Sequence, residues 1–219
     1  THPQFNGNIS NMKWNSPRLQ TQRTYNFSYD GINRLTGAIY TGQQGENYNT
    51  SYGYDNNGNI LHLSRFGHTT GTSHSLIDDL TYAYKGNQLI GVNDNSDTTF
   101  QQHGFTDNGL FMNAVVNDMN THEYLYDKNG NLIKDDNKQI TLIQYNHLNL
   151  PIHLDISPKL DKQGGYIEYL YDAAGIKLRQ TKYINSTLDE ETNYIGNFVY
   201  VGESSLKFIL TDEGRLVSK

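Results

Sequence analysis

The chain has 219 residues and a net charge of −6, with 26 Asn, 20 Gly and 17 Tyr but only five Ala and seven Glu. Ala and Glu favour helices, whereas Tyr favours strands and Asn and Gly favour turns, so a helical bundle and an α/β core are excluded. The acidic balance argues against a nucleic-acid partner, the absence of cysteine excludes disulfides and thiolate chemistry, and no apolar run approaches a membrane span.

Short tyrosine-centred units recur along the chain. Four strong copies begin with Tyr-Asp and end at a Leu or Ile, at residues 29–35, 54–60, 126–132 and 171–178. Weaker copies lie at residues 84–89, 105–110, 145–151 and 210–216, and residues 5–9 match the second half of a unit. A period near 20 residues with insertions of variable length predicts repeated hairpins whose outer loops differ.

Each unit has the features of a β-hairpin. Aromatic residues alternate before the Asp, as in Phe27 and Tyr29, so both rings lie on one face of a strand. The Asp carboxylate accepts from nearby backbone N–H groups, and the Gly three residues later takes the left-handed conformation that a bulged three-residue loop needs. Because Val is strained there, Gly130→Val should destabilise the fold far more than Asp135→Ala. The residues that we expect to define the repeat are Tyr29, Asp30, Tyr54, Asp55, Gly58, Tyr126, Asp127, Gly130, Tyr171, Asp172 and Gly175.

The remaining segments predict connections between hairpins. The insertions are polar and rich in turn residues, and no stretch keeps a 3.6-residue period over three turns. The composition of residues 185–192 is compatible with a helical turn, but the segment is too short to be a stable helix alone. We therefore predict an all-β fold in which residues 1–219 form a single array of stacked hairpins, a curved ribbon without a domain boundary.

The string of Tyr-Asp-x-x-Gly-Asn-Leu units strongly resembles the YD repeats of bacterial Rhs proteins and of the related toxin-complex and teneurin shells. Residues 7–14, 29–38 and 194–200 are similar to the Bacteroidetes-type version. The resemblance implies a section of a spiral shell that scaffolds or encloses a cargo polypeptide, typically a toxin. Its partners would be the rest of the shell, the cargo and a secretion-system component.

The same resemblance implies a secreted or cell-surface location, although the chain carries no signal peptide. In the family, a core segment and a toxin domain usually follow the repeats, and neither precedes Lys219. We therefore expect the chain to be a fragment of shell wall.

Two segments with alternating Asp and Asn, at residues 55–59 and 127–131, suggest calcium ligands as an alternative. An EF-hand loop needs Gly at its sixth position and Glu at its twelfth, whereas Gly58 and Gly130 stand at the fourth. A tight turn also explains the flanking Tyr and Leu or Ile. We predict turns here, with no metal site.

The eight histidines form no spacing typical of a metal or catalytic pair. His62, His68 and His74 recur every six residues, which would place them on one face of an unbroken strand. Gly67 is among the residues expected to interrupt that strand. We therefore interpret these histidines as loop composition.

Adjacent carboxylates at residues 78–79, 135–136 and 190–191 are poor acid–base pairs, because neighbours on a strand point to opposite faces. Solvated turn ends are expected at all three places. No nucleophile elbow, phosphate-binding loop or dinucleotide fingerprint is present. We predict no enzymatic activity and no cofactor.

The tyrosine stripes leave one alternative function open. Tyrosine rings can stack on sugars, so a carbohydrate-binding cell-surface or adhesion module is the competing hypothesis, with glycans as partners. The Tyr positions repeat with every hairpin instead of marking one site. That regularity favours packing of Tyr against Tyr across strands.

Overall fold

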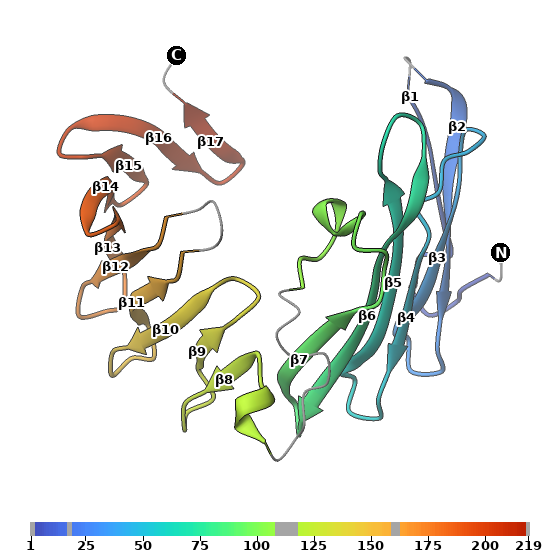
Figure 1. Ribbon diagram of the computed structural model, residues 1–219. Helices are drawn as coiled ribbons and strands as arrows, with labels where there is room; N and C mark the ends of the chain where they lie inside the picture. The colour runs from blue at the N-terminus through green and yellow to red at the C-terminus, as the bar shows by residue number, and fades with distance from the viewer. Residues whose placement is uncertain (1–2, 17–18, 108–117, 159–162, 218–219) are drawn as a thin grey trace. The chain divides into compact units, whose positions relative to one another are not determined.

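The computed structural model describes residues 3–16, 19–107, 118–158 and 163–217, and its fold is all-β (Figure 1). In this part of the chain, seventeen strands form two antiparallel sheets, accompanied by two short 3₁₀ helices, η1 (Gln101–His103) and η2 (Met119–Thr121). The expected all-β class and the repeated hairpins are thereby confirmed. No helix among the described residues has the length and apolar character needed to cross a membrane.

The chain folds as two compact units, Thr1–Glu123 and Tyr124–Lys219. The first unit holds a seven-stranded sheet in which each strand pairs with the one before it. Its strands are β1 (Asn11–Ser16), β2 (Leu19–Tyr29), β3 (Leu35–Thr41), β4 (Thr50–Tyr54), β5 (Ile60–His68), β6 (His74–Lys85) and β7 (Gln88–Asp94). That residues 1–219 form one array stays a prediction.

The second unit repeats this up-and-down order with ten strands. They are β8 (Tyr124–Tyr126), β9 (Leu132–Asp135), β10 (Ile140–Tyr145), β11 (Pro151–Ile156), β12 (Gly165–Tyr171), β13 (Lys177–Ile184), β14 (Thr187–Ile195), β15 (Phe198–Val201), β16 (Ser205–Thr211) and β17 (Gly214–Val217). Because successive strands are antiparallel, alternate connections lie at the same rim of each sheet. We call the rim that carries the turns after β2, β4, β6, β8, β10 and β12 the turn rim.

Two local expectations were wrong. Residues 185–192 contain no helical turn: Asn185 and Ser186, with φ of 48° and 66°, close a tight hairpin and β14 begins at Thr187. This is the two-residue turn whose positive φ angles match the twist of the flanking strands. In the weak copy at residues 105–110, Phe105 does not end a strand as the tyrosines at this position of the repeat do, and the expected return strand falls on residues 108–117, which lie outside the described part.

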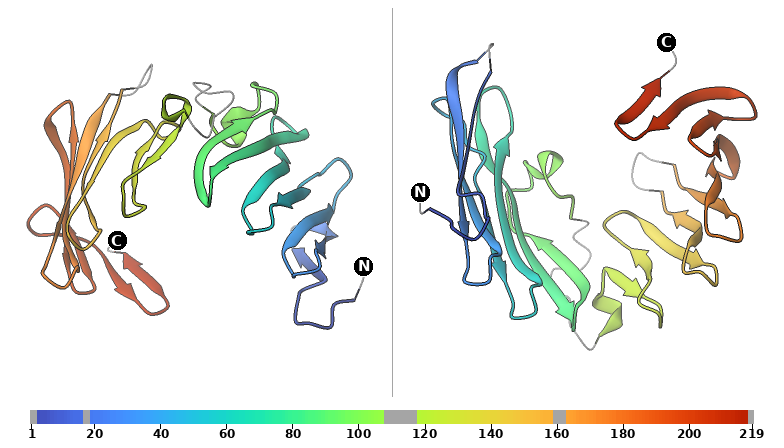
Figure 2. Two further views of the ribbon diagram at one scale, coloured as in Figure 1. Left: turned by 90° about the horizontal axis from the view of Figure 1, so that it is seen from below. Right: turned by 180° about the vertical axis from the view of Figure 1, so that it is seen from behind.

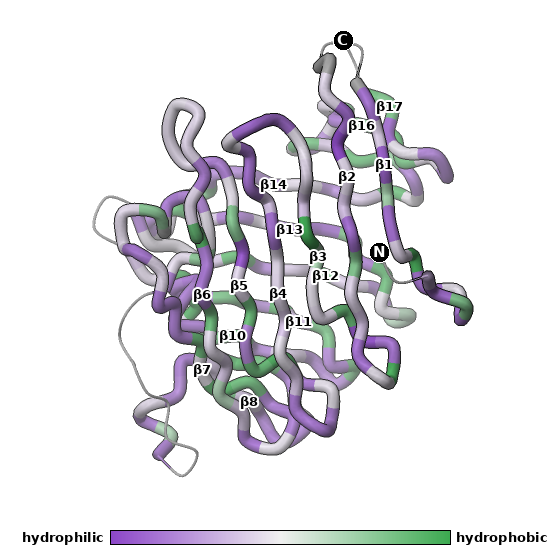
Figure 3. The backbone as a smooth tube through the Cα atoms, turned by 90° about the vertical axis from the view of Figure 1, so that its right-hand side faces the viewer, coloured by the Kyte–Doolittle hydropathy of each residue, from purple (hydrophilic) through white to green (hydrophobic). Residues whose placement is uncertain are grey.

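Each sheet is a single layer of strands (Figure 2). Hydrophobic and hydrophilic residues alternate along the strands (Figure 3), and few side chains are fully buried. The chain exposes 14458 Å², whereas two compact proteins of the units' sizes would together expose about 12,300 Å². The faces of the sheets are therefore more open than those of an ordinary globular domain.

Candidate functional site

Among the described hairpins, five are closed by turns with the same hydrogen bonds. In each turn the first N–H donates to the fifth carbonyl at 2.9–3.0 Å, and the fourth N–H donates to the first carbonyl at 3.0–3.3 Å. The first side chain accepts from the third and fifth N–H groups at 2.8–3.1 Å. The turns begin at Asp30, Asp55, Asp127, Asn146 and Asp172.

The fourth residue of every one of these turns has a positive φ. It is Gly58, Gly130 or Gly175 in three turns, with φ of 92°, 86° and 83°. In the other two it is Asn33 or Asn149, with φ of 69° and 57°. Asn tolerates this conformation because its short polar side chain bonds locally. The loop geometry therefore fixes both the Gly and the Asn found at this position.

The copy at residues 84–89 closes differently. Lys85 pairs directly with Gln88, so only Gly86 and Asn87 form the loop. Gly86 has a φ of 63°, as the first position of this two-residue hairpin turn requires. This copy is similar to the others in sequence but closes with a shorter turn than the five turns described above.

Four of the tyrosines that precede a turn bond to the hairpin before them or, for Tyr29, to the segment before β1. Each hydroxyl donates to the backbone carbonyl of the Leu or Ile that begins the previous return strand or holds the equivalent position, at 2.7–2.9 Å. The pairs are Tyr29 with Ile9, Tyr54 with Leu35, Tyr84 with Ile60, and Tyr145 with Leu132. Burial raises the pKa of Tyr54, Tyr84 and Tyr145, which keeps their hydroxyls protonated as donors.

These hydroxyl contacts were missed in the sequence, where Tyr was assigned only to packing between rings. The spacing of five residues between the Asp and the following Leu or Ile, which three of the four strong copies share, was the available signal. The other two predicted tyrosines have the same place in the repeat: Tyr126 ends β8, and Tyr171 ends β12 with its ring 6.4 Å from that of Tyr169.

Asparagine amides join neighbouring turns along the turn rim. The Nδ2 atoms of Asn57 and Asn59 both donate to Oδ1 of Asn87, at 3.2 and 3.1 Å. In the second unit Asn129 and Asn131 donate in the same way to Asn149, at 3.1 and 3.0 Å, and at the start of the chain Asn6 and Asn8 donate to Asn33. We call the first member of each pair the donor turn and the second the acceptor turn.

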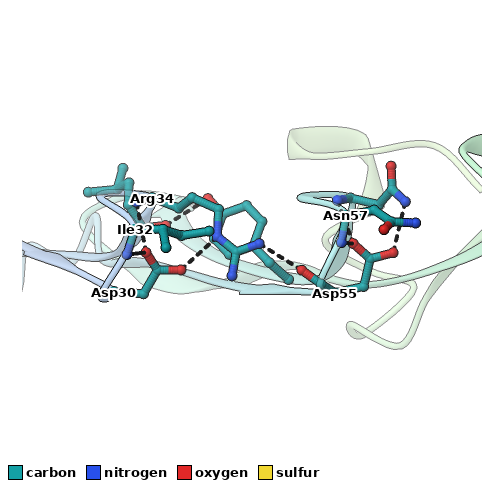
Figure 4. A network of polar contacts seen from close by, with 8 residues as sticks. Asp30, Ile32, Arg34, Asp55 and Asn57 are labelled. Carbon is teal, nitrogen blue, oxygen red and sulfur yellow. Dashed lines mark hydrogen bonds and ion pairs between the residues drawn. The ribbon is translucent and has the colours of Figure 1, made fainter.

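Arg34 links one acceptor turn to the next donor turn (Figure 4). Its Nε lies 2.6 Å from Oδ2 of Asp30, its Nη1 donates to the carbonyl of Asp55 at 2.7 Å, and its guanidinium carbon lies 4.6 Å from the centre of the Tyr54 ring. The backbone N–H of Arg34, followed by its side chain, holds the pKa of Asp30 below its usual value.

The carboxylate oxygens of the turns are already engaged as acceptors. Oδ1 of Asp55 takes two N–H groups and Oδ2 takes the Asn59 amide at 2.8 Å, and Asp127 has the same contacts with Asn131 as amide donor. The Asn59 and Asn131 amides are the main cause of the lowered pKa of these two carboxyls. In the described ranges, no group of three His, Asp or Glu side chains is placed to hold a metal.

Two expectations about histidines and carboxylates need correction. Strand β5 is not interrupted at Gly67: it runs to His68, which faces His74 across the hairpin with ring centres 5.5 Å apart. Asp78 is not a solvated turn end but is 1% exposed, and it accepts from Arg65 and from the Phe105 N–H. A buried carboxylate needs such partners because unpaired burial is costly.

The second acidic pair is also buried. Asp135 is 2% exposed and accepts from the Lys138 N–H at 3.0 Å, while Asp136 lies 2.7 Å from Nζ of Lys134. Both therefore stabilise the β9–β10 hairpin. Asp135→Ala would remove a buried carboxylate together with its bonds to the Lys138 N–H and to Nζ of Lys138, so it is not the mild substitution expected from the sequence.

A buried polar cluster that the sequence did not indicate lies against β2 and β3. Arg23 donates to Oη of Tyr40 at 2.8 Å and to Glu46 at 2.6 Å, and Tyr40 donates to Glu46 at 2.5 Å. The bond from Arg23 is the main cause that lowers the pKa of Glu46 to about 2, while burial and then Glu46 raise that of Tyr40 to about 12. The cluster anchors the loop between β3 and β4.

The aromatic rings on the sheets mostly pack against one another. Tyr166 and Tyr183 stack with centres 4.3 Å apart and an interplanar angle of 18°, and Trp14 and Tyr25 stack at 5.8 Å and 22°. Each such stack covers one face of both rings, which reduces the ring-face area on which a sugar could stack.

Comparison with known proteins gives structural matches at low sequence identity. No family model and no curated protein sequence matches the chain. Among solved structures, a TcdB2-TccC3-TEV crystal structure aligns with 91% of this chain and 12% of its own length, at 9% identity and a TM-score of 0.45. A Tc holotoxin pore from Photorhabdus luminescens aligns with 94% of this chain and 15% of its own, at 12% identity and a TM-score of 0.27. Matches at this level identify neither a family nor an activity for this chain.

Proposed function

We propose that the chain is a wall segment of a YD-repeat shell of the bacterial Rhs type, exported or displayed at the cell surface, that scaffolds or encloses a cargo polypeptide such as a toxin. In this role it has no enzymatic activity. Its partners are the remaining repeats of the shell, the cargo and a secretion-system component. The observation that carries the proposal is the repeated bond from a tyrosine hydroxyl to the preceding hairpin at the turn rim, made by Tyr54, Tyr84 and Tyr145.

Such contacts allow a sheet to grow by adding equivalent hairpins, without a second layer to bury its faces. The exposed area supports this interpretation, because the sheets leave more surface open than compact domains of their size do. The last strand, β17, is exposed throughout, with Leu216 and Val217 exposed by 62% and 63%. A free apolar edge strand of this kind normally requires covering. Further repeats and cargo are the covering that we propose.

The carbohydrate-binding alternative has less support. Tyr166 stacks on Tyr183 and on His153, so much of its ring-face area is already used in packing. The hydroxyls of Tyr54, Tyr84 and Tyr145 are already used as donors to backbone carbonyls.

The experiment is a binding titration followed by fluorescence anisotropy. The probe is reduced, carboxymethylated α-lactalbumin, which stays unfolded, and native α-lactalbumin is the control. We expect saturable binding of the unfolded form alone, weakened by Leu216→Lys at the exposed edge. Lack of binding to the unfolded probe would contradict the proposal, and binding of cell-wall glycans that Tyr→Ala changes abolish would favour the alternative. Intact-mass measurement over time tests the absence of self-cleavage.

A further inference from the structure

Two donor turns carry Asn-Gly at their tips. The pairs lie at residues 57–58 and 129–130, and the side chains of Asn57 and Asn129 are exposed. Asn followed by Gly is chemically labile, because Gly has no Cβ to hinder attack of its nitrogen on the Asn side chain. We propose that Asn57 and Asn129 are deamidation sites whose reaction rate is set by the bonding of each donor turn to its acceptor turn.

The reaction needs no partner other than water. At residue 129, the Gly130 nitrogen attacks Cγ of Asn129 and passes its proton to solvent, so that a new N–Cγ bond forms. The Cγ–Nδ2 bond then breaks, and Nδ2 takes up a proton and leaves as ammonia. Water opens the resulting cyclic imide at either carbonyl, which gives Asp or isoaspartate. The net change is Asn plus water to a carboxylate residue plus ammonium, because the proton of the new carboxylic acid is taken up by the ammonia.

The folded turn restrains both reacting nitrogens. The Gly130 N–H donates to the carbonyl of Asp127 at 3.1 Å, and the leaving nitrogen, Nδ2 of Asn129, donates to Oδ1 of Asn149 at 3.1 Å. Attack therefore requires the turn to open and release both bonds. Exposed turns open locally more often than the core of a fold does, so their opening controls the rate.

The first unit contains an independent copy of this arrangement. The Gly58 N–H donates to the carbonyl of Asp55 at 3.3 Å, and Nδ2 of Asn57 donates to Oδ1 of Asn87 at 3.2 Å. The two sites lie in different units and use different acceptors. Each therefore serves as an internal control for the other.

Deamidation would change the junction between two hairpins. The product at residue 129 has a carboxylate that no longer donates to Oδ1 of Asn149, and it adds negative charge close to Asp127. Isoaspartate also lengthens the backbone of a turn whose fourth residue, Gly130, has a φ of 86°. One lateral contact is then lost while the other pairs of turns stay intact.

The test uses acceptor variants of the whole chain. Asn149→Gly removes the acceptor oxygen and suits the φ of 57° at this position, and Asn87→Ala removes the acceptor in the first unit, where φ is not positive. Deamidation at each site is followed by peptide mapping with mass spectrometry at constant pH and temperature, and circular dichroism checks the fold. The urea-unfolded chain gives the unrestrained rate.

We expect Asn149→Gly to speed deamidation at Asn129 by about fivefold, the factor that corresponds to roughly 1 kcal/mol for one exposed hydrogen bond, and to leave Asn57 unchanged. Asn87→Ala should have the opposite selectivity. Equal acceleration at both sites would show that global unfolding controls the reaction, and would overturn the proposal. Unchanged rates in both variants, or a folded rate equal to that in urea, would overturn it as well.

Discussion

The turn at residues 55–59 allows backbone strain to be measured without side-chain contacts. Gly58 has a φ of 92°, and no atom lies within 4 Å of the place where its Cβ would be. A methyl group therefore costs only the left-handed conformation, about 1–2 kcal/mol for an L-residue. In a unit of this size, Gly58→Ala should lower the melting temperature by about 4–8 °C. Gly58→Asn should cost less, because Asn33 and Asn149 hold the same position with positive φ.

The matched control is Gly31→Ala in the preceding turn. Gly31 also has open space around it, but its φ is not in the left-handed region. This change should be neutral or should stabilise the fold by up to about 1 kcal/mol, through the lower entropy of the unfolded chain. Urea unfolding followed by circular dichroism gives both free energies. Equal losses for Gly58→Ala and Gly31→Ala would refute the assignment of strain to the fourth turn position.

Three further outcomes are expected. Tyr145→Phe removes the donor to the Leu132 carbonyl and should lower the free energy of unfolding in urea by about 1 kcal/mol. Tyr183→Phe should lower it less, because the Tyr183 ring packs by stacking. The reverse order would contradict the hydroxyl contact of Tyr145. Since the pKa of Glu46 is lowered to about 2, its contribution to stability is complete above about pH 4.5 and is lost as pH falls toward 2. Glu46→Gln should reduce this part of the acid dependence, and an unchanged acid profile would argue against it. Arg34→Lys keeps the charge but not the reach to two turns, so it should lower the unfolding temperature, and a wild-type value would show that the bridge is dispensable.

The local geometry of the hairpins could be predicted from sequence because it depends on neighbouring residues. The contacts of Asp55 within its turn span only two to four residues, and the left-handed Gly58 follows from the same short pattern. Local sequence was not sufficient at Gly86, where the repeat pattern suggested the longer turn, or at Asn185, where the composition suggested a helical turn. Both residues lie in two-residue hairpin turns. There the loop length is set by the register of the flanking strands, which local sequence does not fix.

The contacts between hairpins could not be predicted in this way. The Tyr54 hydroxyl donates to a backbone carbonyl 19 residues earlier in the chain. Because every residue has a backbone carbonyl, the residue type at that position does not indicate the bond. Asn87 likewise accepts from residues in another turn, so a count of asparagines gave their number but not their partners. The burial of Asp78 depends on the loop that leads to Phe105, a tertiary contact without a local signal.

The turns at the turn rim keep nearly the same length along each sheet, whereas the connections at the opposite edge differ in length, from two residues between β13 and β14 to eight between β3 and β4. The loop between β5 and β6, at residues 69–73, lies at that opposite edge. A peptide tag or a small domain inserted near Gly71 would extend away from the bonds that join neighbouring hairpins. The same insertion at residues 56–58 would disrupt the bonds from Asn57 and Asn59 to Asn87. The repeat thus has one edge of nearly constant turn length and one edge at which new segments can be added.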